Sequence, residues 1–213
     1  MEYPDLSPYM YRQFPLDMRT VGWLGRERGL QDSNVPVTDA DLHRLRAASL
    51  GPTNLTRGWH DCEWCGSSPV SEGNGEYHYY AHDGEVYAAP AMIFHYVEVH
   101  GYRPPAVFLE SLRVTGTLAW DWRAERLAAM FADDPQDMDS CRTGIVDLAH
   151  WKDPKALEAL LVAARNPRLV LVAGEQLGGS LARFVSCDFA PDLTAETFPG
   201  PVRQGMDKAL RRR

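Results

Sequence analysis

The pattern of apolar and polar positions predicts strands and helices in the first half of the chain and mainly helices in the second. The clearest helix signal of the first half is the stretch VPVTDADLHRLRAASLGP, residues 35–52. Thr38 can cap this helix, and Asp39 and Asp41 fall in its first turn, where the helix dipole favours negative charge. Gly51-Pro52 ends it, and its apolar face comprises Leu42, Leu45 and Leu50.

Shorter elements are predicted on both sides of this helix. VGWLG, residues 21–25, is typical of a short buried strand ended by glycine, with Trp23 in the core. EYHYYAHDGEVYAAP, residues 76–90, predicts a β-hairpin that turns at His82-Asp83-Gly84. Pro90 then begins a helix, AMIFHYVEVHGY, which Gly101 is placed to end. A further short helix is expected after Pro104-Pro105.

The second half has a more helical pattern. LRVTGTLAWDW is a strand or an irregular link, and RAERLAAMFA predicts a helix that ends at Asp133-Asp134-Pro135. Two further helices begin with the same Asx-Pro signal, at Asp153-Pro154 and at Asn166-Pro167, and should pack antiparallel. The second one crosses Gly178-Gly179, which costs roughly 2 kcal/mol of helix propensity. A buried strand at residues 168–173 is the alternative, but we favour helix because the apolar spacing continues past the glycines.

Composition narrows the class of protein. The 213 residues carry a formal net charge of −7, which argues against a nucleic-acid partner, and the arginines at 211–213 are interpreted as a solvated tail. The N-terminal residues lack the basic start and apolar core of a signal peptide, and no apolar run is long enough to cross a membrane. The expected location is therefore the cytoplasm. In that reducing compartment, cysteines spaced C-x2-C favour metal binding over a disulfide.

The stretch RGWHDCEWC, residues 57–65, carries the strongest chemical signal. Cys62 and Cys65 can supply two thiolates to a zinc ion from one tight loop. Three histidines compete for the two remaining positions, so that there are five candidates for four places. His95 ranks first because it lies early in the predicted helix, and His100 ranks second because it lies roughly 140° further round and requires the helix end to loosen. His60 ranks last because its direction is unknown.

A structural zinc site is favoured over a catalytic one. The chain has no H-E-x-x-H and no zinc-deaminase pattern. The competing hypothesis is a metal-dependent hydrolase that uses a histidine of the cluster with Glu63 or Glu76. A site without metal, in which the thiols and imidazoles belong to the core, is the simpler alternative to both. Other residue types are interpreted structurally: Cys141 and Cys187 as buried thiols, and Ser180 as helix surface. The tryptophans are interpreted as packing residues, although Trp120-Asp121-Trp122 would expose one face if it is a strand; the set is Trp59, Trp64, Trp120, Trp122 and Trp151.

Four pieces of the first half resemble a family of uncharacterised bacterial proteins that is frequent in actinobacteria. They are VGWLG, RGWHDCEWCG, GNGE at residues 73–76, and YAAPAMIFHYVEVHGYRPPAVF at residues 87–108. The resemblance supports a common fold unit with G-W-H-x-C-x-x-C and H-Y-x3-H-G-Y-x-P-P patterns and implies no activity. Residues 148–184 resemble one helix pair of a HEAT-like repeat.

Together these patterns predict an α+β protein. Residues 1–112 should form an α+β unit in which zinc staples a knuckle, a β-hairpin and a helix, with Cys62, Cys65, His95 and His100 as ligands. Residues 113–213 should form a mainly helical portion that contains the HEAT-like pair. The expected function is a non-enzymatic protein-interaction or regulatory module, with a protective or immunity-like role by analogy. A protein partner is expected, and the pattern specifies neither its identity nor the oligomeric state.

Overall fold

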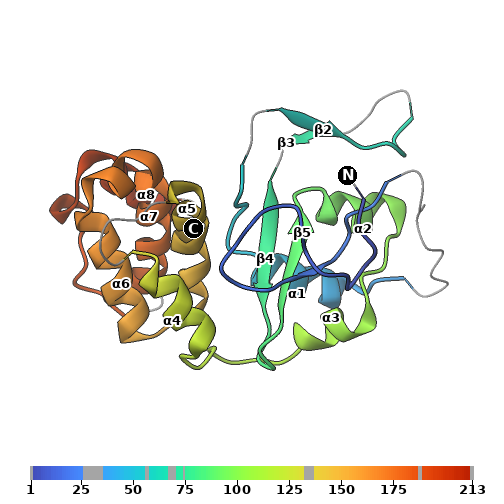
Figure 1. The fold of residues 1–213 in the computed structure, drawn as a ribbon, viewed down its shortest axis with the longest axis horizontal. Helices are drawn as coiled ribbons and strands as arrows, with labels where there is room; N and C mark the ends of the chain where they lie inside the picture. Colours follow the sequence, from blue (N-terminus) through green and yellow to red (C-terminus); the bar gives the residue numbers. More distant parts are fainter. Residues whose placement is uncertain are drawn as a thin grey trace. The chain divides into compact units, whose positions relative to one another are not determined.

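The computed structural model describes residues 2–25, 36–55, 58–66, 71–73, 75–131, 137–186 and 189–211. The chain forms two compact units, Met1–Gly116 and Thr117–Arg213, which we call unit 1 and unit 2 (Figure 1). Unit 1 contains both sheets and unit 2 is helical, so the chain has an α+β fold with a helical C-terminal part, as predicted. No helix in the described residues combines the length and the apolar character needed to cross a membrane.

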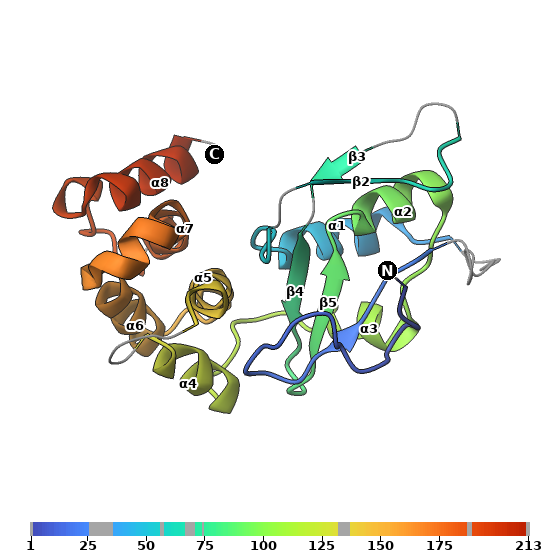
Figure 2. The ribbon, with the colours of Figure 1, turned by 45° about the horizontal axis from the view of Figure 1, so that its top comes forward.

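The main sheet of unit 1 has the order β1-β5-β4, with β1 at Arg19–Thr20, β4 at Glu76–Tyr80 and β5 at Val86–Pro90. Strands β4 and β5 form the predicted antiparallel hairpin, and β1 pairs parallel with β5. Gly84 adopts a φ of +99° in the turn, which favours glycine. A separate antiparallel pair consists of β2, Trp59–Asp61, and β3, Ser71–Gly73. In Figure 2, β2 runs beside helix α2, Ile93–His100.

Two of the predicted boundaries in unit 1 are wrong. The strand expected at residues 21–25 lies two residues earlier, at β1, because Gly22 has a φ of +72° and turns the chain out of the strand. Trp23 is nevertheless a core residue, and its indole N–H donates to the Ala88 carbonyl at 2.9 Å. Pro90 is the last residue of β5 and does not begin the helix, which starts at Ile93.

The other helices of unit 1 are α1, Asp39–Ala48, and α3, Ala106–Ser111. The predicted cap of α1 is confirmed, because the Thr38 hydroxyl accepts a hydrogen bond from the backbone N–H of Asp41 at 3.1 Å. Helix α2 ends as predicted at Gly101, which has a φ of +67°. Helices and main sheet enclose a core rich in aromatic rings, among them Tyr79, Tyr87, Tyr96, Tyr102 and Phe108.

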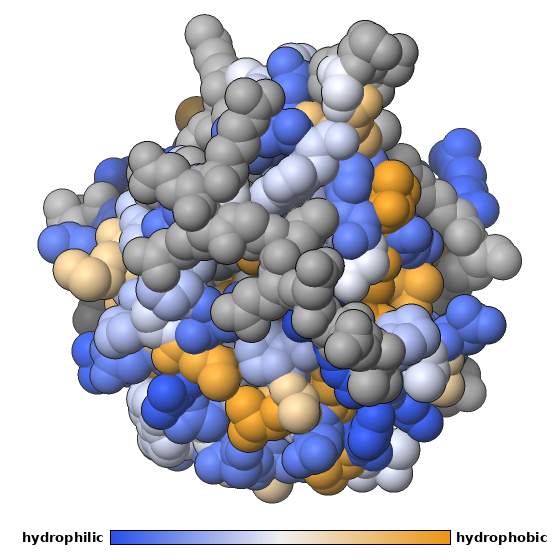
Figure 3. Space-filling model, turned by 90° about the vertical axis from the view of Figure 1, so that its right-hand side faces the viewer, coloured by the Kyte–Doolittle hydropathy of each residue, from blue (hydrophilic) through white to orange (hydrophobic). Residues whose placement is uncertain are grey.

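The surface of unit 1 is mixed. On the face shown in Figure 3, apolar patches alternate with hydrophilic residues. Trp59 is 74% exposed on β2, so the interpretation of this residue as a packing residue is wrong. It is also wrong for Trp122 in unit 2, which is 56% exposed, whereas Trp151 is fully buried as expected. Trp122 is the first residue of a helix whose buried positions are Arg123, Ala124 and Leu127.

Unit 2 contains five α-helices in its described residues: α4, Trp122–Ala129; α5, Met138–Asp147; α6, Pro154–Arg165; α7, Pro167–Ser186; and α8, Gly200–Arg211. Short 3-10 turns follow α5 and precede α8. Residues 113–121 form an irregular link. Helices α5 and α8 were not predicted. The turn at Asp133-Asp134-Pro135, Cys187, Arg212 and Arg213 lie outside the described residues.

The Asx-Pro signals of α6 and α7 are confirmed. The Asp153 carboxylate accepts from the backbone N–H of Lys155, and the Asn166 side-chain oxygen accepts from that of Arg168, each at 2.9 Å. Residues 168–173 are helical, so the favoured interpretation is also confirmed. Helix α7 contacts α5, α6 and α8, and it is kinked at Ala173, where φ is −137° and ψ is 18°.

Gly178 of α7 allows this helix to approach α8 closely. A Cβ atom added to Gly178 would collide with the backbone of α8, including the carbonyl oxygen of Val202, and would lie 2.5 Å from the backbone nitrogen of Met206. A Cβ on Gly205 of α8 would in turn collide with the backbone of Glu175. Gly179, by contrast, faces open space. The helix propensity that Gly178 loses is therefore offset by a close helix-helix approach.

Candidate metal centre

The candidate ligands come from the loop after β2 and from helix α2. Cys62 follows β2 directly, and the chain turns back so that the backbone N–H of Cys65 faces the Cys62 carbonyl at 3.4 Å. The turn ends at Gly66, whose φ of +65° favours glycine. His95 lies in the first turn of α2, and His100 is its last residue. Cys62 is buried, whereas Cys65 and His100 are partly exposed.

The donor atoms of Cys62, Cys65, His95 and His100 all lie within 4.8 Å of one another. The Nε2 atom of His100 is 3.1 Å from the Cys62 sulfur, 3.4 Å from the Cys65 sulfur and 3.1 Å from Nε2 of His95. The Cys65 sulfur is 3.2 Å from Nε2 of His95. The described residues therefore contain a Cys2His2 cluster that could hold a metal ion.

Hydrogen bonds alone do not account for this packing. An imidazole nitrogen carries either one proton or one lone pair, so Nε2 of His100 can make one good hydrogen bond, yet three donor atoms surround it within 3.4 Å. A tetrahedral zinc ion with Zn–S bonds of about 2.3 Å and Zn–N bonds of about 2.0 Å spaces its ligand atoms roughly 3.3 to 3.8 Å apart. The observed separations of 3.1 to 3.4 Å fit that arrangement with small adjustments.

Both histidines reach the cluster from α2, whose end is loosened at Gly101 as expected for His100, because the last backbone bond spans five residues and not the four of an α-helix. Helix α2 stays helical through His100, and the N–H of the capping Gly101 bonds to the Tyr96 carbonyl. Each ring places its outer nitrogen, Nε2, in the cluster, and the two Nε2 atoms are 3.1 Å apart. The two imidazole rings meet edge to face with centroids 4.9 Å apart.

Aromatic and polar neighbours surround the cluster. Trp64 packs on the rings of Tyr96 and His100, with centroids 5.3 and 5.9 Å away. His60, the lowest-ranked candidate, places Nε2 3.4 Å from the Tyr96 hydroxyl and does not belong to the cluster of four. Burial raises the pKa of the Tyr96 hydroxyl, which therefore stays protonated. Burial also raises the pKa of the Cys62 thiol, so that its thiolate form requires a compensating cation.

Glu76, proposed as a hydrolase residue, belongs to a separate buried network. Its carboxylate accepts hydrogen bonds from the Tyr9 hydroxyl at 2.7 Å and from the Asn54 side-chain amide, and it lies 3.0 Å from Nε2 of His78. Burial alone would raise the pKa of Glu76, but these hydrogen bonds outweigh it, and the pKa is lowered. The carboxylate is thus held ionised in the interior by partners from three segments.

The other nearby carboxylates have different surroundings. Glu98 forms an exposed ion pair with Arg46 at 2.6 Å. Glu63 is exposed between the two cysteines. Within the described residues the metal-ligating cluster itself contains no carboxylate.

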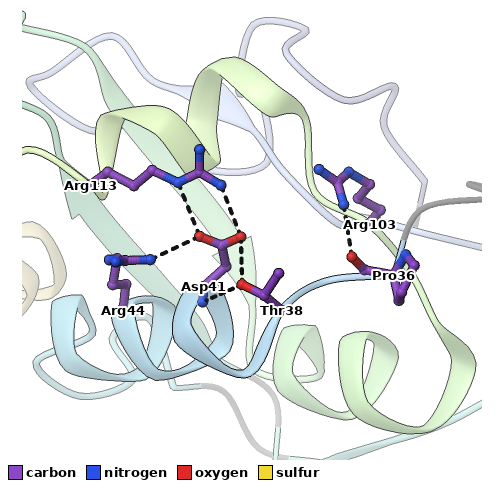
Figure 4. Close-up of polar contacts among 6 residues, drawn as sticks. All are labelled: Pro36, Thr38, Asp41, Arg44, Arg103 and Arg113. Carbon is purple, nitrogen blue, oxygen red and sulfur yellow. Dashed lines mark hydrogen bonds and ion pairs between the residues drawn. The ribbon is translucent and has the colours of Figure 1, made fainter.

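A second buried carboxylate is that of Asp41, which is 2% exposed and was expected only as a first-turn residue of its helix (Figure 4). Arg113 donates to it through Nε at 3.1 Å and Nη2 at 3.0 Å, and Arg44 donates at 3.1 Å. The hydrogen bonds from Arg113 hold the pKa of this carboxyl below its ordinary value. Nearby, Arg103 donates to the Pro36 carbonyl at 2.9 Å. The short motif around Asp41 signals a helix start, and only the fold shows the partner 72 residues away.

Cys141 and Ser180 carry side chains that can act as nucleophiles in enzymes, but both occupy structural positions here. The Cys141 thiol is buried and lies 3.4 Å from the Met130 carbonyl, and burial raises its pKa to about 11. Ser180 is buried and not on the helix surface, and its hydroxyl donates to the Ile145 carbonyl at 2.9 Å. Both residues therefore connect helices of unit 2.

The features above define an α+β domain with a Cys2His2 cluster, followed by a helical unit. The family described as "Domain of unknown function (DUF7919)" matches residues 1–113, more than half of the 213 residues, and the chain belongs to this family. This match confirms the resemblance to an uncharacterised family in the first half of the chain. No curated protein and no solved structure gives a significant match.

Proposed function

We propose that Cys62, Cys65, His95 and His100 bind one zinc ion that fastens the loop after β2 to helix α2. On this basis the chain is a zinc-stabilised, non-enzymatic protein-interaction or regulatory module that works in the reducing cytoplasm. The observation that carries the proposal is the convergence of four donor atoms within 4.8 Å from two segments that are about thirty residues apart.

Zinc is the metal that this donor set favours. Two thiolates and two imidazoles in a tetrahedral arrangement are typical of structural zinc sites, and hard cations such as magnesium or calcium prefer oxygen ligands. Two thiolates also balance the charge of a divalent ion, which allows the partly buried site to be neutral overall. Both cysteines are free, as this role requires.

The number of protein donors supports a structural role. Catalytic zinc sites usually keep one position open for water, whereas four donors complete a tetrahedral sphere. The competing hydrolase hypothesis therefore needs one donor to leave, and a carboxylate to act as base. Glu76 is a poor candidate for this base, because its carboxylate already accepts hydrogen bonds from Tyr9 and Asn54. The exposed Glu63 is the remaining candidate.

An interaction role is supported by apolar side chains on the surface of unit 2. Val162, Leu171, Val172 and Phe189 are between 38% and 84% exposed. Contiguous exposed apolar surface is typical of sites that bind other proteins, and Val162 and Phe189 line one such surface together. A protective or regulatory role against another protein is consistent with such a surface.

Elemental analysis of the purified full chain tests the zinc site, with about one zinc per chain expected. The double variant Cys62→Ser/Cys65→Ser is expected to lose the metal, because hydroxyls are poor zinc ligands. His60→Ala is the matched control: it removes an imidazole beside the cluster and should leave the zinc content unchanged. Zinc retained in the double variant, or lost in His60→Ala, would contradict the proposed ligand set.

Cobalt substitution separates a structural site from a catalytic one. Four protein ligands predict the intense visible absorption of tetrahedral cobalt with thiolate ligands, unchanged by small anions that compete for an open position. A weak spectrum that responds to azide would favour the hydrolase hypothesis. In that case Glu63→Gln would be compared with the wild-type chain for hydrolysis of model esters.

A further inference from the structure

The outer face of helix α6 forms an open groove. Its apolar lining consists of Pro154, Leu157, Leu161 and Val162 on α6, together with Phe189 from the segment after α7, and it encloses about 530 Å³. All of these residues belong to unit 2. Val162 is 41% exposed and Phe189 is 38% exposed, so the groove presents apolar surface to solvent.

The wall formed by Phe189 is fixed by contacts within unit 2. The backbone N–H of Phe189 donates to the Phe184 carbonyl at 3.0 Å, and the two rings pack edge to face with centroids 5.8 Å apart. Because Phe189 is already held in place, binding of an occupant would not carry the conformational-entropy cost of ordering this residue. The groove is thus a preformed surface.

Two charged side chains, Glu158 and Arg165, also line this groove. They are seven residues apart, which places them on the same side of the helix, about two turns or roughly 10 Å from each other. That separation is too long for an ion pair within the helix. Neither side chain has a hydrogen-bond or ion-pair partner in the part of the chain that the structure describes, so both charges are available to an external partner.

The order of residues along the groove is self-complementary. The midpoint between Glu158 and Arg165 falls between the apolar neighbours Leu161 and Val162. If a second copy of α6 lies antiparallel across this midpoint, Glu158 of each copy faces Arg165 of the other, and the apolar residues meet at the centre. A two-fold axis produces this arrangement, because both copies of an isologous interface contribute the same patch.

We propose that the α6 groove is the contact surface of a symmetric homodimer, with a second copy of this chain as its occupant. The inference deepens the proposed interaction role, since it names a partner for unit 2, but it does not depend on the zinc site in unit 1. One helix from each copy makes a small interface, so the association should be weak and concentration-dependent. It should also weaken with added salt, because the charge pairs are near the surface.

Sedimentation velocity of the full chain over a range of concentrations tests this proposal. The wild-type chain should form dimers, and Glu158→Arg or Arg165→Glu should each raise the dissociation constant about tenfold or more, because each places like charges opposite one another twice. The double variant Glu158→Arg/Arg165→Glu exchanges the charges and should dimerise like the wild type. An equimolar mixture of the two single variants should form heterodimers, since every pair across the axis is then attractive.

A matched control is Glu196→Arg, which makes the same change of net charge as Glu158→Arg at an exposed position outside the groove and should leave dimerisation unchanged. Circular dichroism confirms that each variant is folded. A wild-type chain that remains monomeric at all concentrations would overturn the proposal, as would single variants that dimerise normally. Zinc content, measured in the same samples, shows separately whether the metal proposal holds.

Discussion

The two units of the chain use different contacts to connect segments that are distant in sequence. In unit 1, polar side chains make these connections: Tyr9 reaches Glu76 across 67 residues, Tyr102 reaches Asp5 across 97, and Arg113 reaches Asp41 across 72. In unit 2, the polar connections between distant segments span about half that separation: Ser180 reaches Ile145 across 35 residues, and Lys208 reaches Glu175 across 33. Its helices meet mainly through apolar side chains and glycines.

The difference follows from the elements that each unit contains. Strands of two to five residues give the sheets of unit 1 few backbone hydrogen bonds, so buried polar networks and the Cys2His2 cluster add long-range connections to its apolar core. Helices satisfy most of their backbone groups internally, so the packing of unit 2 depends mainly on complementary shapes. The stability of unit 1 should therefore depend on bound metal and on pH, and the stability of unit 2 on the volume of the side chains between its helices.

Removal of the proposed zinc ion gives the largest expected difference between the units. Chelation should destabilise unit 1 by several kcal/mol, because the energy of binding to a structural zinc site contributes directly to folding. Hydrogen exchange of the full chain, followed by mass spectrometry, should show faster exchange in β4, β5 and α2. The amides of α6 and α7 serve as the internal control and should keep their protection. Equal loss of protection in both units would contradict the comparison.

Substitution of Gly178 tests the close packing of α7 against α8 in unit 2. Gly178→Ala should destabilise this unit by about 2 to 3 kcal/mol, because the new Cβ meets the backbone of α8. Gly179→Ala is the matched control, since that position is open, and it should stabilise the helix by roughly 0.5 to 1 kcal/mol. Denaturant unfolding of both variants measures the contrast. Similar values for the two glycines would show that α7 and α8 are not in close contact.

The charge of Asp41 provides a smaller, pH-dependent test in unit 1. Because the pKa of Asp41 is lowered in the folded state, its contribution is fully present above the ordinary pKa of about 4 and is lost as the pH falls through the folded value. At neutral pH, Asp41→Asn should reduce stability by about 1 to 2 kcal/mol, through weaker hydrogen bonds to Arg113.

The difference in stability between wild type and Asp41→Asn should therefore narrow as the pH is lowered below about 4, the ordinary range of an aspartate. Comparison of the two chains at each pH cancels the effect of acid on the metal ligands. Asp39→Asn, at an exposed position of the same helix turn, should change stability less at every pH. A constant difference between wild type and Asp41→Asn across the range would contradict an ionised Asp41 in the fold.

Local signals in the sequence were sufficient for much of the fold. The caps at Thr38, Asp153 and Asn166 act within three residues, and the hairpin around Gly84 depends on one turn, so each could be predicted from neighbouring residues. Helix α8 could not, because its sequence begins at Gly200 and contains Gly205. Glycine disfavours a helix in isolation, and its use here depends on the approach of α7, which no local pattern reveals.

The candidate site was only partly accessible from the sequence. The C-x2-C spacing and the two histidines of one helix indicated the four members of the cluster, but not whether both rings could reach it. The polar partners of Glu76 and Asp41 were not identified, because Tyr9 and Arg113 are far away in the chain and carry no motif of their own. Contacts of this kind are determined by the tertiary fold.

The ion pair of Arg113 with Asp41 has a practical consequence for any attempt to study the family domain alone. The family match ends at this arginine, beyond the last helix of unit 1. A polypeptide ended at Leu112 would retain every strand and helix of unit 1 and would still lose the bidentate partner of a buried carboxylate. Trimming by secondary structure would therefore remove a residue on which the interior of the domain depends, and the cut belongs after Gly116.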